Sequence, residues 1–270
     1  MRHKIKRIVK NFLKPKVLPY NNVVPKIVFH GGLIQINDTQ PEDVFIVGFP
    51  KSGNTLMQHI IAHLVYGLNE EGSRSIINLI APDIYASSHY FRFNDVCYFK
   101  SHERPQPHYK KVIYLLRDGR EALLSYHHMM KNMGKEVSLN DLYSGNIKIY
   151  GGLWHEHIED WKSNPYNADI LFVRFENLKN DKLQELKRIC NFLKIERSNT
   201  ELKKVVQLTS FNHMKSLEQR TDWKNMKKEV LFKTGNFVRK GELKSYINEV
   251  PEELIRKFEK ASKNSFYSFV

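Results

Sequence analysis

A glycine-rich turn early in the chain has the residue types that bind a phosphate group. The run VFIVGFPKSGNT, at residues 44–55, carries Gly48 and Gly53 and ends in a hydroxyl at Thr55. When such a turn leads from a strand into a helix, backbone N–H groups and the positive end of the helix dipole point at the same place. The spacing therefore predicts an anion-binding site in front of this turn.

The lysine of this turn is displaced relative to an ATP-binding loop. In a Walker loop, a lysine directly precedes the hydroxyl residue that holds magnesium. Here Asn54 occupies that position, and the lysine is Lys51. A Walker B strand ends in aspartate directly, whereas the run VIYLLRD places Arg117 before Asp118. A phosphate site with these cations and without a metal carboxylate fits a nucleotide that transfers its group without magnesium.

Four short apolar runs, rich in β-branched and aromatic residues, are predicted to form the strands that position these residues. They span residues 44–47, 96–99, 112–116 and 170–175, and helical patterns follow them. We therefore expect an α/β fold with a mainly parallel central sheet flanked by helices. In such sheets, ligands bind beyond the carboxyl ends of the strands. The residues found there are basic: Lys51, Lys100, His102, Arg117 and Arg120.

Two long segments between the predicted elements lack clear periodicity. They span residues 131–150 and 216–245, and we predict that they are loops or lids. Neither an internal repeat nor a low-complexity tract interrupts the pattern.

Five ordered motifs resemble those of one enzyme family. FPKSGNT is similar to the 5′-phosphosulfate loop of sulfotransferases that use 3′-phosphoadenylyl sulfate, in which the loop commonly reads YPKSGTTW. VIYLLRDGREALLSY is similar to their 3′-phosphate segment, and VRFENL, LTSFNHM and FVRKG are similar to three later elements. The resemblance extends from about Val44 to about Tyr246. It implies a phosphate-loop-like sulfotransferase fold, with a single domain at residues 41–270 after a basic N-terminal extension at 1–40.

The resemblance implies 3′-phosphoadenylyl sulfate as donor, no metal, and three catalytic residues. Lys51 would meet the negative charge that develops on the leaving group. Lys100 would steady the oxygens of the transferring sulfuryl group. His102, in a KSH run similar to the family's lysine–threonine–histidine element, would accept the proton of the acceptor as general base.

The resemblance also assigns the nucleotide contacts. Thr55 and the N–H groups of residues 52–54 would hold the 5′-phosphate. Arg117, Ser125 and the segment 239–241 would hold the 3′-phosphate. The complete set implied for nucleotide binding is Lys51, Ser52, Gly53, Asn54, Thr55, Arg117, Ser125, Phe175, Thr209, Phe211, Arg239, Lys240 and Gly241.

Several positions depart from the family pattern. Leu56 stands where many members have a tryptophan that stacks on adenine, and Phe175 and Asn177 replace a tyrosine and an aspartate. The adenine of the implied donor would thus lack the tryptophan that usually stacks on it and the tyrosine hydroxyl that usually lies nearby. Phe211 is the remaining aromatic candidate for stacking.

Charge alone leaves the class of partner open. A formal net charge of +14 suits a polyanion, an anionic lipid surface or a small phosphorylated ligand. Two functions compete with sulfuryl transfer: a magnesium-dependent phosphate-loop nucleotide kinase, which Asn54 argues against, and a nucleic-acid-binding protein. Because the lysines are spread along the chain without a recognised reader motif, we expect no nucleic-acid partner.

The sequence does not decide whether the acceptor is a small molecule, a lipid or a saccharide. As the acceptor group, a hydroxyl is favoured over an amine. The HHMM run at 127–130 is a candidate for lining the acceptor pocket. An aromatic cluster that includes Tyr85, Tyr90 and Phe91 fits either a flat acceptor or a packed lid.

Cysteine usage and hydropathy favour a cytoplasmic protein. Only Cys97 and Cys190 occur, both in apolar stretches, and no window approaches 18 consecutive apolar residues. Residues 1–16 form a basic amphipathic segment, which either packs on the domain or contacts an anionic membrane.

Two histidine pairs invite a metal interpretation. His59 and His63 are one helical turn apart, and His155 and His157 flank a glutamate. The first pair lacks the glutamate of a metalloprotease helix, and the second would diverge on a helix. We predict that neither pair binds a metal.

Overall fold

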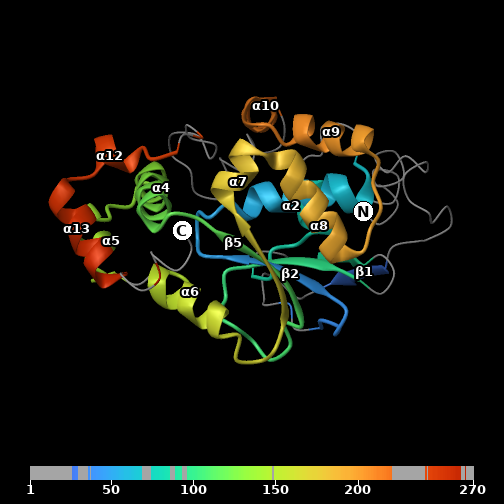
Figure 1. Cartoon of the computed structure of the whole chain (residues 1–270), viewed down its shortest axis with the longest axis horizontal. Coiled ribbons are helices and arrows are strands. Elements are labelled where there is room, and N and C mark those ends of the chain that lie inside the picture. The colour runs from blue at the N-terminus through green and yellow to red at the C-terminus, as the bar shows by residue number, and fades with distance from the viewer. Residues whose placement is uncertain are drawn as a thin grey trace.

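The four predicted strands form one parallel sheet in the order β4–β2–β5–β6. They are β2 (Val44–Gly48), β4 (Tyr98–Ser101), β5 (Lys111–Leu116) and β6 (Asp169–Arg174). Parallel pairing sets Val47 opposite Ser101 and Gly48 opposite Leu115, so the carboxyl ends of these strands meet at one edge. The expected α/β fold with a mainly parallel sheet is confirmed (Figure 1).

Each strand differs from its predicted range by one or two residues at one or both ends, and two of these differences bear on the site. The second strand begins at Tyr98, because the N–H of Cys97 donates to the buried carboxylate of Asp43 (2.7 Å) rather than to a neighbouring strand. The last strand ends at Arg174, and Phe175 is the first residue of a helix. Lys100 therefore lies inside β4, and His102 is the first residue after it.

Helices cover both faces of the sheet. They are α2 (Asn54–Tyr66), α3 (Arg74–Ile80), α4 (Gly119–Asn132), α5 (Leu139–Tyr143), α6 (Trp154–Ser163), α7 (Phe175–Asn180), α8 (Lys182–Leu193), α9 (Asn199–Leu208), α10 (Phe211–Arg220), α12 (Tyr246–Glu249) and α13 (Glu252–Ala261). Figure 1 shows α2, α8 and α9 on one side of the sheet and α6 on the other.

Each strand is buried on both faces because successive side chains point to opposite helix layers. Val44 and Ile46 pack in a core with residues of α2, α3, α8 and α9. Phe45 and Val47 pack in a second core with residues of α4, α5, α6 and α13. These two cores hold the carboxyl edge of the sheet in place.

Some elements were not predicted. β1 (Lys26–Phe29) pairs with β3 (His89–Arg92) as a separate antiparallel ribbon, and β1 lies in the segment predicted to be an N-terminal extension. Tyr90 and Phe91 of β3 are buried in the cores, so they do not line an acceptor pocket. The loop prediction was wrong for the end of α4, for α5 and for the end of α10.

The structure is a computed structural model that describes residues 26–29, 36, 38–68, 74–85, 89–92, 96–147, 149–220, 241, 243–262 and 265. The basic segment at 1–16, Arg239 and Lys240 lie outside these residues. Within the described ranges, no helix has the length and hydropathy of a membrane span.

Candidate active site

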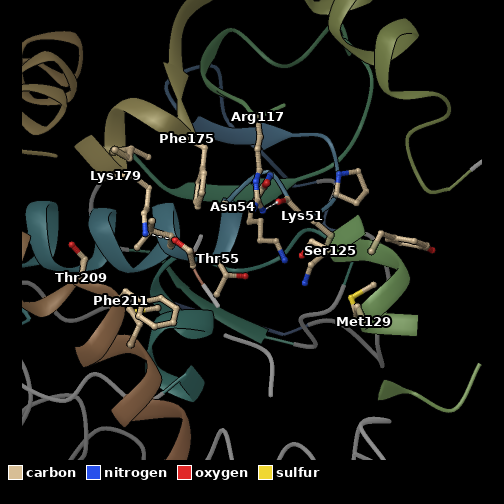
Figure 2. Close-up of a pocket in the computed structure, with 18 of the residues that line it drawn as sticks. Lys51, Asn54, Thr55, Arg117, Ser125, Met129, Phe175, Lys179, Thr209 and Phe211 are labelled. Atoms are coloured by element: carbon tan, nitrogen blue, oxygen red, sulfur yellow. Dashed lines mark hydrogen bonds between the residues drawn. The ribbon is translucent and has the colours of Figure 1, made fainter. Parts of the chain in front are cut away.

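A cavity of about 460 Å³ opens where the turn after β2 meets the ends of β4, β5 and β6 (Figure 2). Twelve predicted site residues line it: Lys51, Gly53, Asn54, Thr55, Lys100, His102, Arg117, Ser125, Phe175, Thr209, Phe211 and Gly241. Of the HHMM run, Met129 lines the cavity, whereas His127 bonds to the carbonyl of Val137 and His128 to Glu249. Residues between 51 and 241 in the sequence are thus brought to one site by the fold.

The turn between β2 and α2 has the backbone of an anion cradle. Its Lys51 adopts φ of 71° and its Gly53 φ of 103°, a left-handed conformation that is uncommon for a lysine. The amides of Gly53, Asn54 and Thr55 have no acceptor within the described part of the chain. The Ser52 hydroxyl, 1% exposed, likewise has no partner among the described residues. A buried set of donors of this kind fits an anionic ligand.

Two details of the cradle differ from the expectation. The amide of Ser52 already donates to Phe49 (3.1 Å), so it is not available to a phosphate. The Asn54 side chain points into the sheet, where its amide group donates to the carbonyls of Gly48 (3.3 Å) and Ser101 (3.2 Å). Asn54 therefore ties the ends of β2 and β4 together and offers the cavity only its backbone N–H.

Gly53 makes close packing against Phe175 possible. Gly53→Ala is expected to destabilise the fold by about 1–2 kcal/mol, because its φ of +103° is strained for any residue with a Cβ. The new Cβ would also lie 2.7 Å from the Phe175 ring and displace it. We expect a lower unfolding midpoint and a weaker affinity for the nucleotide that the sequence resemblance implies.

Gly145→Ala is the matched control for this prediction. It also has a positive φ, of +74°, but it faces the Leu153 side chain at 3.3 Å. It should lower the unfolding midpoint and leave nucleotide affinity unchanged. Wild-type nucleotide affinity in Gly53→Ala would contradict the prediction.

Arg117 connects the end of β5 to the phosphate turn. Its Nη1 donates to the carbonyl of Lys51 (2.7 Å), and its guanidinium lies 4.4 Å from the centre of the Phe175 ring. Its Nη2 lies 3.5 Å from a carboxylate oxygen of Glu121. The arginine thus holds the left-handed conformation of Lys51 while it faces the cavity.

Glu121 anchors the segment that follows Gly241. This carboxylate is 2% exposed and accepts hydrogen bonds from the Ser245 hydroxyl (3.1 Å) and the Tyr246 amide (2.9 Å). Because Glu121 also pairs with Arg117, it joins α4, the end of β5 and the C-terminal segment. This buried link depends on packing between separate elements and was not predicted from local pattern.

His102 is held in a defined tautomer. Its Nδ1 lies 2.7 Å from the carbonyl oxygen of Gly48, and a carbonyl only accepts, so Nδ1 carries the proton. Burial, with Lys100 as a further cause, lowers the pKa of His102 to about 4. At neutral pH the ring is therefore uncharged, and its Nε2 has a lone pair able to accept a proton.

Lys100 has a partner that the sequence did not identify. Its ammonium forms an ion pair with Asp83 at 2.6 Å, and backbone hydrogen bonds join the two segments on either side of it. Both side chains are largely buried. Asp83 thereby fixes the position of Lys100 at the cavity wall.

His157 supports the backbone of His102 instead of binding a metal. Its Nε2 donates to the carbonyl of His102 (3.1 Å), and its Nδ1 accepts from the Tyr114 hydroxyl (2.7 Å). Burial lowers the pKa of His157 to about 3, so it stays uncharged. Among the described residues, no group of three or more histidine, cysteine, aspartate or glutamate side chains is arranged for a metal ion.

Several residues of the cavity wall were not predicted from the sequence: Pro50, Tyr126, Tyr150, Leu178, Lys179, Lys182 and Met214. Leu56, at the position of a tryptophan in the family pattern, also lines the cavity. Lys179 follows Phe175 at a spacing of four within α7, so helix periodicity was an available signal for it. Lys182 is the first residue of α8, after the non-helical Asp181, and local periodicity does not place it at the site.

Comparison with known proteins identifies the family of this site. The family model described as "Sulfotransferase domain" matches residues 41–269. The rabbit (Oryctolagus cuniculus) amine sulfotransferase is 23% identical over 261 residues, which cover 86% of this chain and 83% of the relative. Sulfotransferase 1E1 of Mus musculus is 26% identical over 248 residues, covering 82% of each.

Solved structures share the fold. The mouse sulfotransferase SULT7A1 complexed with PAP has a TM-score of 0.60 at 22% identity and covers 83% of both chains. Retinol dehydratase in complex with androsterone and inactive cofactor PAP has a TM-score of 0.69 at 17% identity. That comparison covers 99% of this chain and 95% of the other.

Proposed function

Because the chain belongs to the sulfotransferase domain family, we propose that it transfers a sulfuryl group from 3′-phosphoadenylyl sulfate to a small-molecule, lipid or saccharide acceptor. The acceptor atom is a hydroxyl oxygen or an amine nitrogen, and the transfer is direct and in line. PAP, which is adenosine 3′,5′-bisphosphate, is present in the solved structures of SULT7A1 and retinol dehydratase, and this supports the choice of donor.

One observation carries the proposal: the turn of Lys51 combines unpaired amides, a buried hydroxyl and an arginine in a single cradle. A phosphate oxygen accepts hydrogen bonds and carries negative charge, so this donor set fits it. Thr55 and the amides of Gly53 and Asn54 would hold the 5′-phosphate. Arg117 and Ser125 would hold the 3′-phosphate, together with the segment 239–241.

Charge stabilisation is the main task of the residues around this cradle. When bound, the donor supplies an SO₃ group whose departure leaves negative charge on a phosphate oxygen, by analogy with phosphoryl transfer. The ammonium of Lys51 neutralises that charge. Lys100, held by Asp83 (2.6 Å), steadies the oxygens of the transferring group.

His102 acts as the general base. The hydrogen bond from Nδ1 to Gly48 leaves Nε2 as the proton acceptor. A base must be unprotonated before transfer, and the lowered pKa, about 4, meets this requirement at neutral pH. His157 and Tyr114 hold the backbone of His102, which orients the ring.

The acceptor lies on the side of the cavity lined by Tyr126, Met129 and Tyr150. These side chains are aromatic or apolar, and the Tyr150 hydroxyl donates to Glu103, the residue after His102. The names of relatives include an amine sulfotransferase, which supports a small acceptor. We place the protein in the cytoplasm, as the name of cytosolic sulfotransferase 1 of Arabidopsis thaliana supports.

Nucleotide titration tests the proposal directly. The purified protein should bind adenosine 3′,5′-bisphosphate in the micromolar range without a divalent ion, and it should bind neither ATP with magnesium nor oligonucleotides comparably. Transfer of radiolabelled sulfate from the donor to a panel of phenols, alcohols and amines then tests the reaction. Selective binding of ATP with magnesium would support a kinase and contradict the proposal.

Arg117→Ala is expected to weaken the binding of adenosine 3′,5′-bisphosphate by about ten- to hundredfold, because an arginine–phosphate contact is a charge-assisted hydrogen bond. Calorimetry should show a much smaller loss for adenosine 5′-monophosphate, which lacks the 3′-phosphate. Arg256→Ala is the control, since Arg256 pairs with Glu252 on the exposed surface of α13. Equal losses for both nucleotides would remove Arg117 from the 3′-phosphate.

A further inference from the structure

Two lysines of the cavity wall lack a carboxylate partner within the described part of the chain. The ammonium of Lys179 donates to the carbonyl of Gly241, and that of Lys182 donates to the carbonyl of Thr209. Lys182 also lies 3.3 Å from the Thr209 hydroxyl oxygen. Lys179 also lies 5.7 Å from the centre of the Phe211 ring. Cations whose hydrogen bonds go to neutral oxygens suit a cavity that binds a ligand with hydrogen-bond acceptors.

The ammonium of Lys182 has one more proton than its hydrogen bonds to Thr209 use. An ammonium carries three protons, and the two oxygens of Thr209 account for two of them. The Thr209 hydroxyl itself donates to the carbonyl of Val205 (2.7 Å), so its proton is already used. The third proton of Lys182 is therefore the donor that this end of the cavity can offer.

Lys182 lies away from Lys51, Thr55 and Ser125, three of the proposed phosphate contacts, whereas Gly241 packs against Phe211 at the same end as Lys182. Figure 2 shows Thr209 and Phe211 on the side of the pocket away from Ser125, with Lys51 and Thr55 between them. Lys182 is bonded to Thr209 on that side. Phe211, with a flat aromatic face, lines the same end of the cavity.

The end of the cavity near Thr209 and Phe211 lacks the tryptophan ring and the tyrosine hydroxyl of the family pattern. Leu56 lines the cavity without an aromatic ring, and Phe175 has no hydroxyl. A base held there would have apolar contact from Leu56 and stacking on Phe211, but its ring nitrogens would need a donor.

We propose that Lys182 recognises the adenine base, donating a hydrogen bond to a ring nitrogen of the purine while Phe211 stacks on its face. This rests on the proposed function, because it assumes that the nucleotide binds with its phosphates at Lys51 and Arg117. Lys182 then determines base specificity, since it favours bases with an acceptor at that edge.

The pKa of Lys182 agrees with this role. Burial, with the nearby charge of Lys179 as a second cause, lowers it to about 8. A partly desolvated ammonium keeps its proton at neutral pH and gains strength as a hydrogen-bond donor in a site from which water is excluded. Lys179 lies instead beside Gly241, next to the segment proposed for the 3′-phosphate.

A pair of ligands that differ only in the base tests the proposal. Affinities for adenosine 3′,5′-bisphosphate and for the abasic sugar, 1-deoxyribose 3,5-bisphosphate, are measured by calorimetry for the wild type, Lys182→Met, Lys182→Arg and Lys179→Met. Lys182→Met should weaken the adenosine ligand about tenfold or more and leave the abasic ligand unchanged, whereas Lys182→Arg should retain most of the affinity. Lys179→Met should weaken both ligands by removing a positive charge beside Gly241, and any additional loss for the adenosine ligand measures the contact of Lys179 with the Phe211 ring.

The outcomes separate a failure of nucleotide binding from a failure of the adenine contact alone. Wild-type protein that does not bind adenosine 3′,5′-bisphosphate would overturn the proposed function and this inference with it. Normal wild-type binding combined with equal losses for both ligands in Lys182→Met, or with no loss, would overturn the inference alone. Unfolding midpoints of the variants separate a local loss of contact from a loss of fold.

Discussion

Replacing His102 by alanine is expected to lower kcat by roughly 10²–10⁴-fold, which is the usual contribution of a positioned general base. The affinity for adenosine 3′,5′-bisphosphate should stay at the wild-type value, because the His102 ring bonds to Gly48 and offers its other nitrogen to the acceptor side. Turnover with radiolabelled donor and calorimetry on the same preparation measure both quantities.

His155→Ala is the control for this experiment. His155 lies in α6, two residues from the buried His157, and is absent from the cavity wall. Its replacement should leave kcat unchanged. Unchanged turnover in His102→Ala would remove His102 from the role of general base.

The pH profile gives a second test of the same residue. Because the pKa of His102 is lowered to about 4, the ring accepts a proton from the acceptor at any pH well above that value. On the acid side, kcat should therefore stay level through pH 6 and fall only as the pH approaches 4. A fall centred near 6.5, the ordinary pKa of a histidine, would contradict the buried and uncharged state described for His102.

Replacing Lys51 by alanine is expected to cost about 3 kcal/mol of transition-state stabilisation, a loss of roughly 10²–10³-fold in kcat. The ammonium acts on charge that appears as the sulfur–oxygen bond breaks, so the loss should be larger in kcat than in the affinity for the bisphosphate product. Single-turnover rates measure the chemical step directly.

Alanine is a suitable replacement at this position. Lys51 has a left-handed backbone with φ of 71°, and alanine has the same Cβ, so the backbone strain is the same in both proteins. The Lys51 carbonyl can still accept from Arg117. Lys135→Ala, on the exposed surface, is the control. Loss of affinity without loss of kcat would assign Lys51 to binding alone.

Much of the fold follows from local pattern. Each strand of the sheet is a short, doubly buried run of β-branched and aromatic residues, and such a run is recognisable because nearly every position is apolar. The ribbon of β1 and β3 was missed for the opposite reason. Its strands are four residues long, and pairing residues 26–29 with 89–92 depends on contacts across about sixty residues of sequence.

The candidate site likewise has one part that local sequence pattern predicts and another that depends on tertiary packing. The phosphate turn was recognisable because its glycines, lysine and hydroxyl are consecutive, so local backbone geometry alone places them. The pairing of Lys100 with Asp83 and the burial of Glu121 were not recognisable, since each depends on how separate elements pack.

The sequence by itself determined the order of the motifs, the strand-to-helix turn at Lys51 and the residue types that face the carboxyl edge of the sheet. The tertiary structure alone decided which nitrogen of His102 carries a proton, that Arg117 holds the Lys51 turn, and that Lys182 reaches Thr209. The physical reason is the distance in sequence over which each interaction acts. Backbone conformation depends on neighbours in sequence, whereas a hydrogen bond between side chain and distant carbonyl exists only after packing has brought both groups within about 3 Å.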